Sequence, residues 1–347
     1  MVWKIKKPIK IGFVGAGFMG QLAHLVNFTD ISNCEVVALA DYRIDLASRV
    51  ADRYSIPKFC ASHEELCADS SIDAIVHITS DDAHAPISID SLNSGKHVYT
   101  EKPMATNLTD ARRMVETAES RNRQLMIGYM KRFDPGIELA RSILDELRMT
   151  NELGLITHVR GYCFKGDWVC SVGRAETTNE SYPEIESRVP QWLPRNQIQE
   201  FYQFNNVYCH NINLARYLLG EVGALKFANL DSPTKLMVLN MDGYDVILEL
   251  GSVTANFWEE GFKVYFEDGW VEVQSPPPLL RNVPAKVSVY KAGSIQQHIQ
   301  PQSDWGWAFR RAAEHFIESI QTGNPVNPSG SNSIRDLEIV EEVFRRF

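Results

Sequence analysis

The sequence predicts an α/β fold in two parts: a parallel sheet with crossover helices, then a mostly antiparallel open sheet that also carries helices. Two patterns support this prediction. Up to about residue 130, short apolar runs alternate with segments of ten residues or more that have helical spacing, which is typical of parallel strands joined by helices. From about residue 155, strand-like runs follow one another directly, which favours antiparallel pairing.

In the first part, the apolar runs expected to form buried strands are IKIGFVGAG (a strand and turn), CEVVALAD, DAIVHIT, KHVYTEKP and QLMIGYM. The expected helices between them are FMGQLAHLVNFT, RIDLASRVADRY, DDAHAPISIDSLNSG and NLTDARRMVETAESR. Asn107 stands at the start of the last helix, where an asparagine side chain can cap the free N–H groups. We therefore predict that residues 1–130 form the first domain.

In the second part, residues 131–347, the strand-like runs are LITHVRGYCFKGDW, KFANL, TKLMVLN, DVILEL, SVTANFWEE, FKVYFEDGWVEVQS and AKVSVYKAG. Asp-Gly pairs at 242–243 and 268–269 are turn signals. Two helices are expected near the C-terminus, and the last one packs either in this domain or back on the first. Residues 166–200 show no period, and so long a loop inside a compact domain is often functional.

Composition narrows the class of protein. A chain of 347 residues is comfortable as two domains, and its net charge of −9 argues against nucleic acid or an anionic membrane as partner. No run approaches the roughly 18 uncharged apolar residues of a membrane helix, and the short, glycine-broken apolar run near the start does not suit a signal peptide. Six cysteines without a CxxC pair indicate reduced thiols in a cytoplasmic protein, with no metal site.

A glycine-rich turn predicts a dinucleotide site. The motif GAGFMG (Gly15, Gly17, Phe18, Met19, Gly20) follows the first strand and opens a helix, whose N-terminus can bind a pyrophosphate. Asp41 ends the second strand about 20 residues further on, where an acid can hold the adenosine ribose hydroxyls. Its charge favours NAD over NADP, although Arg43 leaves NADP open.

Three further motifs make a family resemblance specific. The segments EKPMATN at 101–107, GYMKRFDP at 128–135 and HNINLARYLLGE at 210–221 resemble, in order and spacing, those of the Gfo/Idh/MocA oxidoreductases. The resemblance implies a Rossmann domain and an α/β domain with a large, mostly antiparallel sheet. It also implies nicotinamide-dependent oxidation or reduction at CH–OH groups of a sugar or cyclitol. A homodimer or homotetramer formed through the C-terminal sheet is expected.

The resemblance implies that several residues lie near the cofactor and the reacting oxygen. Lys102 of the EKP motif is implied to lie near the nicotinamide, where an ammonium stabilises developing alkoxide charge. Pro103 is implied to follow a cis bond. The other residues implied beside the cofactor are Thr79, Ser80, His84 and Glu101. In that position His84 is more often structural than catalytic.

The family's substrate motif has an aspartate four residues before a histidine and often another acid three after it. Here these positions hold Asn206, His210 and Asn213. At i and i+4, Asn206 and His210 share one helix face, and we place His210 at the head of that helix. We predict that His210 is the general acid/base, with Lys102 assisting and Asn206 binding substrate. The alternative is a helix residue without a proton role.

Further residues are candidates for the substrate site. Tyr129 and Arg132 resemble residues that line the family's cleft, with packing between the domains as the alternative role. Aromatic side chains in and before the long loop can stack on the C–H faces of sugars, and we select Tyr162, Trp168 and Trp192. Burial of the loop against a neighbouring subunit would explain these residues equally well.

Three classes of function fit the sequence. The first is an NAD(P)-dependent dehydrogenase or oxidoreductase of a sugar, cyclitol or glycoside. The second is an NAD-using glycosidase or eliminase that oxidises a hydroxyl transiently. The third is a non-enzymatic dinucleotide-binding regulator, against which Lys102 and His210 argue. The substrate, the direction of reaction, the choice between NAD and NADP, the retention of cofactor between turnovers, the identity of the base and the oligomer size stay open.

Overall fold

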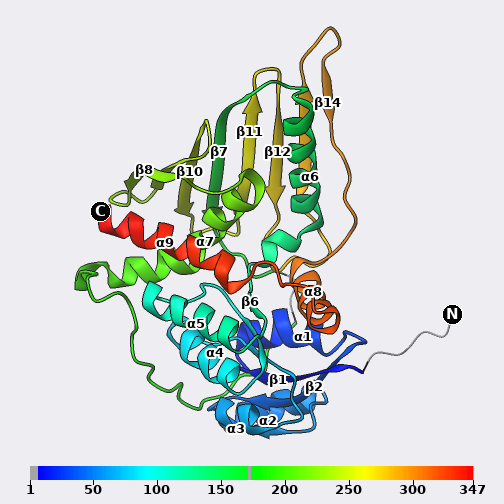
Figure 1. The fold of residues 1–347 in the computed structure, drawn as a ribbon, viewed down its shortest axis with the longest axis vertical. Helices are drawn as coiled ribbons and strands as arrows, with labels where there is room; N and C mark the ends of the chain where they lie inside the picture. The colour runs from blue at the N-terminus through cyan, green and yellow to red at the C-terminus, as the bar shows by residue number, and fades with distance from the viewer. Residues whose placement is uncertain (1–6, 171–172, 347) are drawn as a thin grey trace, which may run out of the picture. The chain divides into compact units, whose positions relative to one another are not determined.

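The structure is a computed structural model that describes residues 7–170 and 173–346 (Figure 1). The chain forms two compact units. Unit 1 consists of the described residues of 1–129, 173–206 and 312–338, and unit 2 of those of 130–172, 207–311 and 339–347. The chain first passes between units after residue 129, one residue before the predicted boundary. The return of 173–206 to unit 1 was not part of the prediction, whereas packing of the last helix on the first domain was one of its alternatives. The domain assignment stays a prediction.

Unit 1 is built on a six-stranded sheet in which every strand pair is parallel. The strand order is β3-β2-β1-β4-β5-β6, so successive strands are added first on one side of β1 and then on the other, as in doubly wound dinucleotide-binding folds. The strands are β1 (Ile9–Val14), β2 (Cys34–Ala40), β3 (Phe59–Cys60), β4 (Ala74–His77), β5 (His97–Thr100) and β6 (Leu125–Ile127). The predicted Rossmann fold is therefore confirmed.

The four predicted helical segments of unit 1 follow the strands as expected from the sequence, whereas α3 and the short strand β3 before it were not predicted. The predicted N-cap is confirmed, because the Asn107 side chain accepts from Asp110 N at 2.8 Å. The helix after the glycine turn opens with a π-helical turn, η1, before a short α segment. The elements are η1 (Gly20–Leu25), α1 (Val26–Phe28), α2 (Ile44–Arg53), α3 (His63–Ala68), η2 (Asp81–Ala83), α4 (His84–Asn93), α5 (Leu108–Ser120) and η4 (Arg195–Gln197).

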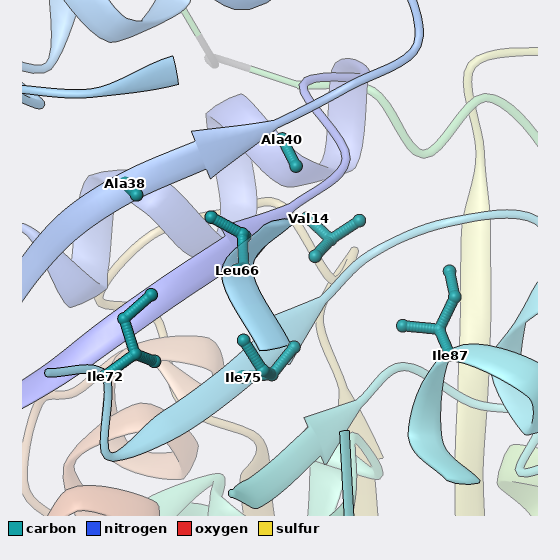
Figure 2. Close-up of a cluster of buried hydrophobic side chains, with 7 residues drawn as sticks. All are labelled: Val14, Ala38, Ala40, Leu66, Ile72, Ile75 and Ile87. Atoms are coloured by element: carbon teal, nitrogen blue, oxygen red, sulfur yellow. The ribbon is translucent and has the colours of Figure 1, made fainter. Parts of the chain in front are cut away.

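One buried cluster shows how helices are held on this sheet (Figure 2). Side chains from β1, β2 and β4 meet those of Leu66 on α3 and Ile87 on α4. Full burial of an aliphatic side chain stabilises the fold by about 1.5–3 kcal/mol. The seven residues are Val14, Ala38, Ala40, Leu66, Ile72, Ile75 and Ile87. Packing of this kind fixes the carboxyl ends of the strands, where the candidate site lies.

Unit 2 contains an eight-stranded sheet in the order β14-β13-β12-β11-β7-β10-β9-β8. All neighbours are antiparallel except β7 and β10, which confirms a mostly antiparallel open sheet. Helix α6 (Pro135–Thr150) lies along the sheet beside β12 (Figure 1). The strands are β7 (Ile156–Lys165), β8 (Ala224–Asn229), β9 (Lys235–Asn240), β10 (Asp245–Ser252), β11 (Trp258–Phe266), β12 (Gly269–Ser275), β13 (Lys286–Lys291) and β14 (Gln297–Ile299).

Two predictions about the second half are wrong in detail. The run SVTANFWEE is not one strand, because a mostly exposed turn at 253–257 separates β10 from β11. His210 is not at the head of its helix, because α7 spans Ile198–Leu219 and places it past the middle. Phe201 and Phe204 are both buried at helical spacing, and their packing extends the helix toward its N-terminus. The remaining elements are η3 (Met130–Phe133), α8 (Ala308–Thr322) and α9 (Gly330–Arg346).

Candidate active site

The glycine turn after β1 is fixed by close backbone contacts. Gly15 has φ +102°, and a Cβ on it would lie 2.0 Å from the carbonyl oxygen of Ile78. A Cβ on Gly20 would lie 2.1 Å from the carbonyl oxygen of Gly15. At Gly17 the space is open, since its nearest atom, on Arg43, is 4.0 Å from the Cβ position. The turn can thus bring bare backbone close to a phosphate, as the motif predicts.

Asp41 is held in place at the end of β2 by the turn and by Arg43. Its Oδ2 accepts from Ala16 N at 2.8 Å. The Arg43 guanidinium donates to both carboxylate oxygens at 2.9 Å, and Arg43 N donates to Oδ1 at 2.9 Å. The hydrogen bond with Asp41 raises the pKa of Arg43 against the lowering effect of burial. Asp41 is therefore a fixed negative charge at the position predicted to bind ribose.

A cavity of about 200 Å³ lies at this edge of the sheet, entirely within unit 1. Close to it, the buried Thr79 Oγ1 and Ser80 Oγ have no hydrogen-bond partner among the described residues. Open backbone at the glycine turn, an acid and two spare hydroxyls fit a dinucleotide. The cavity is lined by Val14, Gly15, Ala40, Asp41, Tyr42, Ala61, His63, Thr79, Asp82, Ala83, Pro86, Ile87, Tyr182, Ile185, Glu186 and Arg188.

One wall of this cavity comes from residues 174–188, within the long loop that the sequence predicted. Figure 1 shows the segment as a green trace without helix or strand. Its first residues bind η1 and α2: Gln21 exchanges two hydrogen bonds with the Glu176 backbone, at 3.0 and 2.7 Å. Arg49 Nη2 donates to Thr177 O at 2.5 Å. The segment therefore belongs to the nucleotide side of the site.

The other end of the 174–188 segment is bound by acidic side chains. Arg188 Nε and Nη2 donate to the two Asp110 oxygens at 2.7 and 2.9 Å. Asp82 Oδ1 accepts two hydrogen bonds, from Arg188 N at 3.0 Å and from Thr106 Oγ1 at 2.8 Å. Tyr202 Oη on α7 donates to Asp82 Oδ2 at 2.6 Å, and burial followed by this bond raises the pKa of Tyr202 to about 12. Asp82 thus connects three segments of unit 1.

Lys102 follows β5 and is bound by Asn206 of α7. Lys102 Nζ donates to Asn206 O at 2.8 Å and to Asn206 Oδ1 at 3.3 Å. Asn206 Nδ2 in turn donates to the Asp81 carboxylate at 3.1 and 3.2 Å. Asn206 holds the position where the family motif implied an acid, and the Asp81 carboxylate lies beside it. Asp81, Asn206 and Lys102 all belong to unit 1.

Two buried contacts hold the EKP segment. The Lys102–Pro103 bond is cis, and His84 Nδ1–H donates to Pro103 O at 2.7 Å, which suits the structural role considered for His84. Glu101 Oε1 lies 2.9 Å from His24 Nε2, and Glu101 Oε2 accepts from Lys102 N at 3.0 Å. Burial raises the pKa of Glu101, but His24 and the Lys102 charge outweigh burial and lower the pKa below its ordinary value. Glu101 is therefore an ionised support for the Lys102 backbone.

His210 lies one helical turn after Asn206 on α7, and only 9% of it is exposed. The neighbouring Asn211 Nδ2 donates to Glu260 Oε1 of β11 at 3.2 Å. The same oxygen pairs with Lys131 Nζ at 2.5 Å, and Glu260 is 1% exposed. The second oxygen of Glu260 has no hydrogen-bond partner among the described residues. Unit 2 thus contains a buried ion pair that also binds Asn211, the residue after the predicted catalytic histidine in the sequence.

The other predicted substrate residues have separate surroundings. Arg132 is buried, its Nε donates to Asn213 Oδ1 at 2.7 Å, and its guanidinium lies 5.2 Å from the Tyr217 ring centre. Tyr162 is buried on β7, and burial first of all raises its pKa to about 12. Tyr129 is also buried, whereas Trp168 in unit 2 and Trp192 in unit 1 are partly exposed. Their substrate roles stay predictions.

Sequence reasoning missed several charged residues of these clusters. Asp81 and Asp82 follow β4 at the carboxyl edge of the sheet, so their position in ITSDDAH was a usable signal. Glu260 was also detectable, because strand alternation puts it on the same face as Phe262 and Val264. Glu180 and Arg188 gave no signal, since nothing periodic surrounds them.

No helix in residues 7–170 or 173–346 is long and apolar enough to cross a membrane. Within the same ranges, no cluster of three or more histidine, cysteine or acidic side chains is arranged to hold a metal ion. The six cysteines, all of which the structure describes, are free thiols, as expected from their spacing.

Comparison with known proteins supports the interpretation of unit 1. Residues 9–129 match the family model described as oxidoreductase family, NAD-binding Rossmann fold. The inositol 2-dehydrogenase of Salmonella paratyphi B is 34% identical over 161 residues, which are 44% of this chain and 46% of that protein. The chain thus aligns with about half the length of that relative.

Solved structures resemble the whole chain at low identity. Levoglucosan dehydrogenase in complex with NADH and levoglucosan has a TM-score of 0.76 and 18% identity, covering 98% of both chains. A 3-ketoreductase from Actinomadura kijaniata in complex with NADP has a TM-score of 0.74 and 18% identity, covering 97% of both. At such identities the likeness shows the fold alone. The matched model identifies residues 9–129 as an NAD-binding Rossmann domain of the Gfo/Idh/MocA oxidoreductase family, and the two sheets agree with that family's fold.

Proposed function

We propose that the protein is an NAD(P)-dependent oxidoreductase that transfers hydride between nicotinamide and a secondary hydroxyl or ketone of a sugar, cyclitol or glycoside. The observation that carries this proposal is the Lys102–Asn206–Asp81 chain of hydrogen bonds. Asp81 adjoins Asp82, which lines the dinucleotide cavity. An oriented ammonium near such a cavity suits a reaction in which an alcohol oxygen gains negative charge.

Lys102 and His210 have different roles in the proposed reaction: Lys102 stabilises negative charge, and His210 transfers the proton. Bound nicotinamide would accept the hydride from the carbinol carbon in oxidation and return it in reduction. Lys102 holds the hydroxyl oxygen and stabilises its negative charge. His210 takes the hydroxyl proton in oxidation and gives it back in reduction. Asn206, oriented by Asp81, directs Lys102 and binds a second hydroxyl.

NAD is the proposed cofactor in preference to NADP. Asp41 presents a fixed carboxylate where the adenosine ribose would lie, and a carboxylate accepts from two ribose hydroxyls but repels a 2′-phosphate. The neighbours solved with NADH and with NADP show that this fold accommodates either nucleotide. Arg43 does not reverse the preference, because its Nε and Nη2 already donate to the Asp41 carboxylate.

A carbohydrate or cyclitol substrate is supported by the inositol 2-dehydrogenase relative and the levoglucosan-bound neighbour. Tyr129, Arg132, Tyr162, Trp168 and Trp192 are proposed to bind it. We also propose a cytoplasmic homodimer or homotetramer formed through the sheet of unit 2. Free thiols at all six cysteines support a reducing compartment.

The test is reduction of bound NAD by a panel of sugars, cyclitols and glycosides, followed by NADH absorbance and by analysis for cleaved products. We expect at least one compound to reduce the cofactor. Lys102→Ala and His210→Ala should each lower kcat by about 100-fold or more. Lys58→Ala, at an exposed lysine of unit 1 outside the cavity lining, is the matched control and should behave as wild type.

Two results would redirect the assignment. Bond cleavage without net NADH would indicate the glycosidase or eliminase reaction. Dinucleotide binding without any redox change, unaffected by either substitution, would contradict catalysis and favour a regulator.

A further inference from the structure

The feature behind this inference is Glu180, which lies in the 174–188 segment and places its carboxylate at the N-terminus of α2. Glu180 Oε1 accepts from Asp45 N at 3.1 Å, and Oε2 accepts from Leu46 N at 3.1 Å. Thr178 Oγ1 also donates to Oε2, at 2.9 Å. The free N–H groups of the first turn of α2 are thus bound by a carboxylate from a distant part of unit 1.

The same segment covers Arg43 next to that carboxylate. The Arg43 guanidinium lies 4.9 Å from the centre of the Tyr182 ring, and Tyr182 lines the cavity together with Asp41. Arg43 therefore contacts both the Tyr182 ring and the Asp41 carboxylate. Glu180 is close enough to raise the pKa of Arg43 through its charge, after the larger contributions of Asp41 and Tyr182.

These contacts remove the groups that would receive an extra phosphate on the adenosine ribose. In a dinucleotide fold, a 2′-phosphate is bound by an arginine after β2, and helix N-termini bind phosphates through their N–H groups. Here Asp41 binds the arginine and Glu180 binds the N–H groups. Burial raises the pKa of Glu180, but bonds from Asp45 N, Thr178 and Leu46 N outweigh it and lower the pKa, so the carboxylate is ionised at neutral pH.

We propose that Glu180 is a specificity-determining residue that excludes the 2′-phosphate, so that this cavity takes NAD(H) and rejects NADP(H). The inference rests on the proposed function and extends it to a residue outside the strands and glycine turn. Asp41 acts on the ribose hydroxyls, whereas Glu180 fills the anion position beside them. Like charges brought together in a binding site carry a large penalty, which gives selectivity by repulsion.

The test is the binding of NADH and NADPH to the full chain freed of nucleotide, followed by nucleotide fluorescence and calorimetry. Wild type should bind NADH at least about 100-fold more tightly than NADPH. Glu180→Gln keeps an oxygen for the α2 N–H groups but removes the charge. It should tighten NADPH binding about tenfold and leave the Kd for NADH within about twofold. Glu184→Gln, on the exposed side of the same segment, is the matched control.

The outcomes separate this inference from the proposed function. If NADPH binds wild type as tightly as NADH, or if Glu180→Gln leaves the ratio of the two Kd values unchanged, the role of Glu180 is refuted while the oxidoreductase proposal stands. If neither nucleotide binds, both fail. An unchanged thermal unfolding temperature in Glu180→Gln shows that a changed ratio is not the result of a damaged fold.

Discussion

Asn206 holds the position where the family resemblance implies an aspartate, and the structure places a carboxylate next to it, on Asp81. The amide joins two unlike partners: its oxygen accepts from Lys102 and its nitrogen donates to Asp81. An aspartate at 206 could accept from the lysine but could not donate to Asp81. An asparagine at 206 is therefore compatible with a carboxylate at Asp81, whereas an aspartate is not. The site has an acid on Asp81 in place of the one that the helix motif lacks.

This arrangement predicts that Asn206→Asp, which restores the implied family residue, damages the site. Two carboxylates about 3 Å apart cannot both ionise without a large rise in the pKa of one of them. We expect the free energy of unfolding to fall by about 1–2 kcal/mol and kcat to fall about tenfold. Urea denaturation and steady-state kinetics measure the two effects.

The double variant Asn206→Asp/Asp81→Asn is the matching control, because it exchanges the two groups and restores a donor beside the acid. It should recover most of the lost stability, with a coupling free energy of about 1 kcal/mol or more. An Asn206→Asp variant as stable and active as wild type would show that the Asp81 contact has no energetic role.

At the level of elements, what the sequence predicted follows from local periodicity. Most strands and helices were predicted because each one repeats apolar residues over its own length, as β1, β2 and α5 do. The start of α7 was placed too late, at His210 and not at Ile198, because polar residues interrupt the apolar spacing around Phe201 and Phe204. The 174–188 segment could not be placed from the sequence, because its hydrogen-bond partners lie 121 residues or more away along the chain. This holds for the bonds of Arg174, Glu176, Thr177 and Glu180. Local sequence does not record such contacts.

The 174–188 segment should control how quickly cofactor leaves. Its far end is bound through Arg188 to Asp110 and Asp82, and its residues line the cavity. Arg188→Ala removes the bidentate pair with Asp110 and should raise the NADH dissociation rate about fivefold, since local opening becomes easier. Stopped-flow displacement of bound NADH measures this rate.

Arg195→Ala, at an exposed arginine of η4, provides the comparison for that experiment. Equal dissociation rates for wild type, Arg188→Ala and Arg195→Ala would mean that the segment does not limit release. An effect on the rate without an effect on kcat would place cofactor release outside the catalytic cycle.

For the molecule as a whole, alternation of strands and helices was enough to predict the first sheet, and the direct succession of strand-like runs was enough to predict the second. Neither pattern could predict that residues 173–206 and 312–338 belong to unit 1, since those segments have no strand in its sheet. Their membership depends on distant contacts, such as Tyr99 against Phe316, whose ring centres lie 5.6 Å apart. Candidate site residues at the glycine turn and at the ends of β2 and β5 were accessible to motif reasoning, as was Asn206, whereas Glu180 and Arg188 were not.

The stability of the whole chain should fall in mild acid, and His97 on β5 is one measurable source. Its Nδ1 accepts from Gln124 N at 3.0 Å, and burial, followed by the charge of Arg123, lowers its pKa from 6.5 to about 4. Between these values the unfolded chain binds a proton that the folded chain does not, so the free energy of unfolding decreases as pH falls from 6.5 toward 4. Above that window His97 is neutral in both states and adds no pH dependence.

His97→Asn keeps an acceptor for Gln124 N but cannot titrate, so the variant isolates this effect. From pH 7 to pH 4.5, wild type should lose about 2 kcal/mol more stability than the variant, as measured by urea denaturation. The buried His77, whose pKa burial also lowers, gives both proteins a common decline. His298→Asn, at an exposed histidine of β14, should run parallel to wild type. If the stability of His97→Asn falls with pH as steeply as that of wild type, the neutral imidazole does not contribute to acid sensitivity. The decline then has to come from other groups.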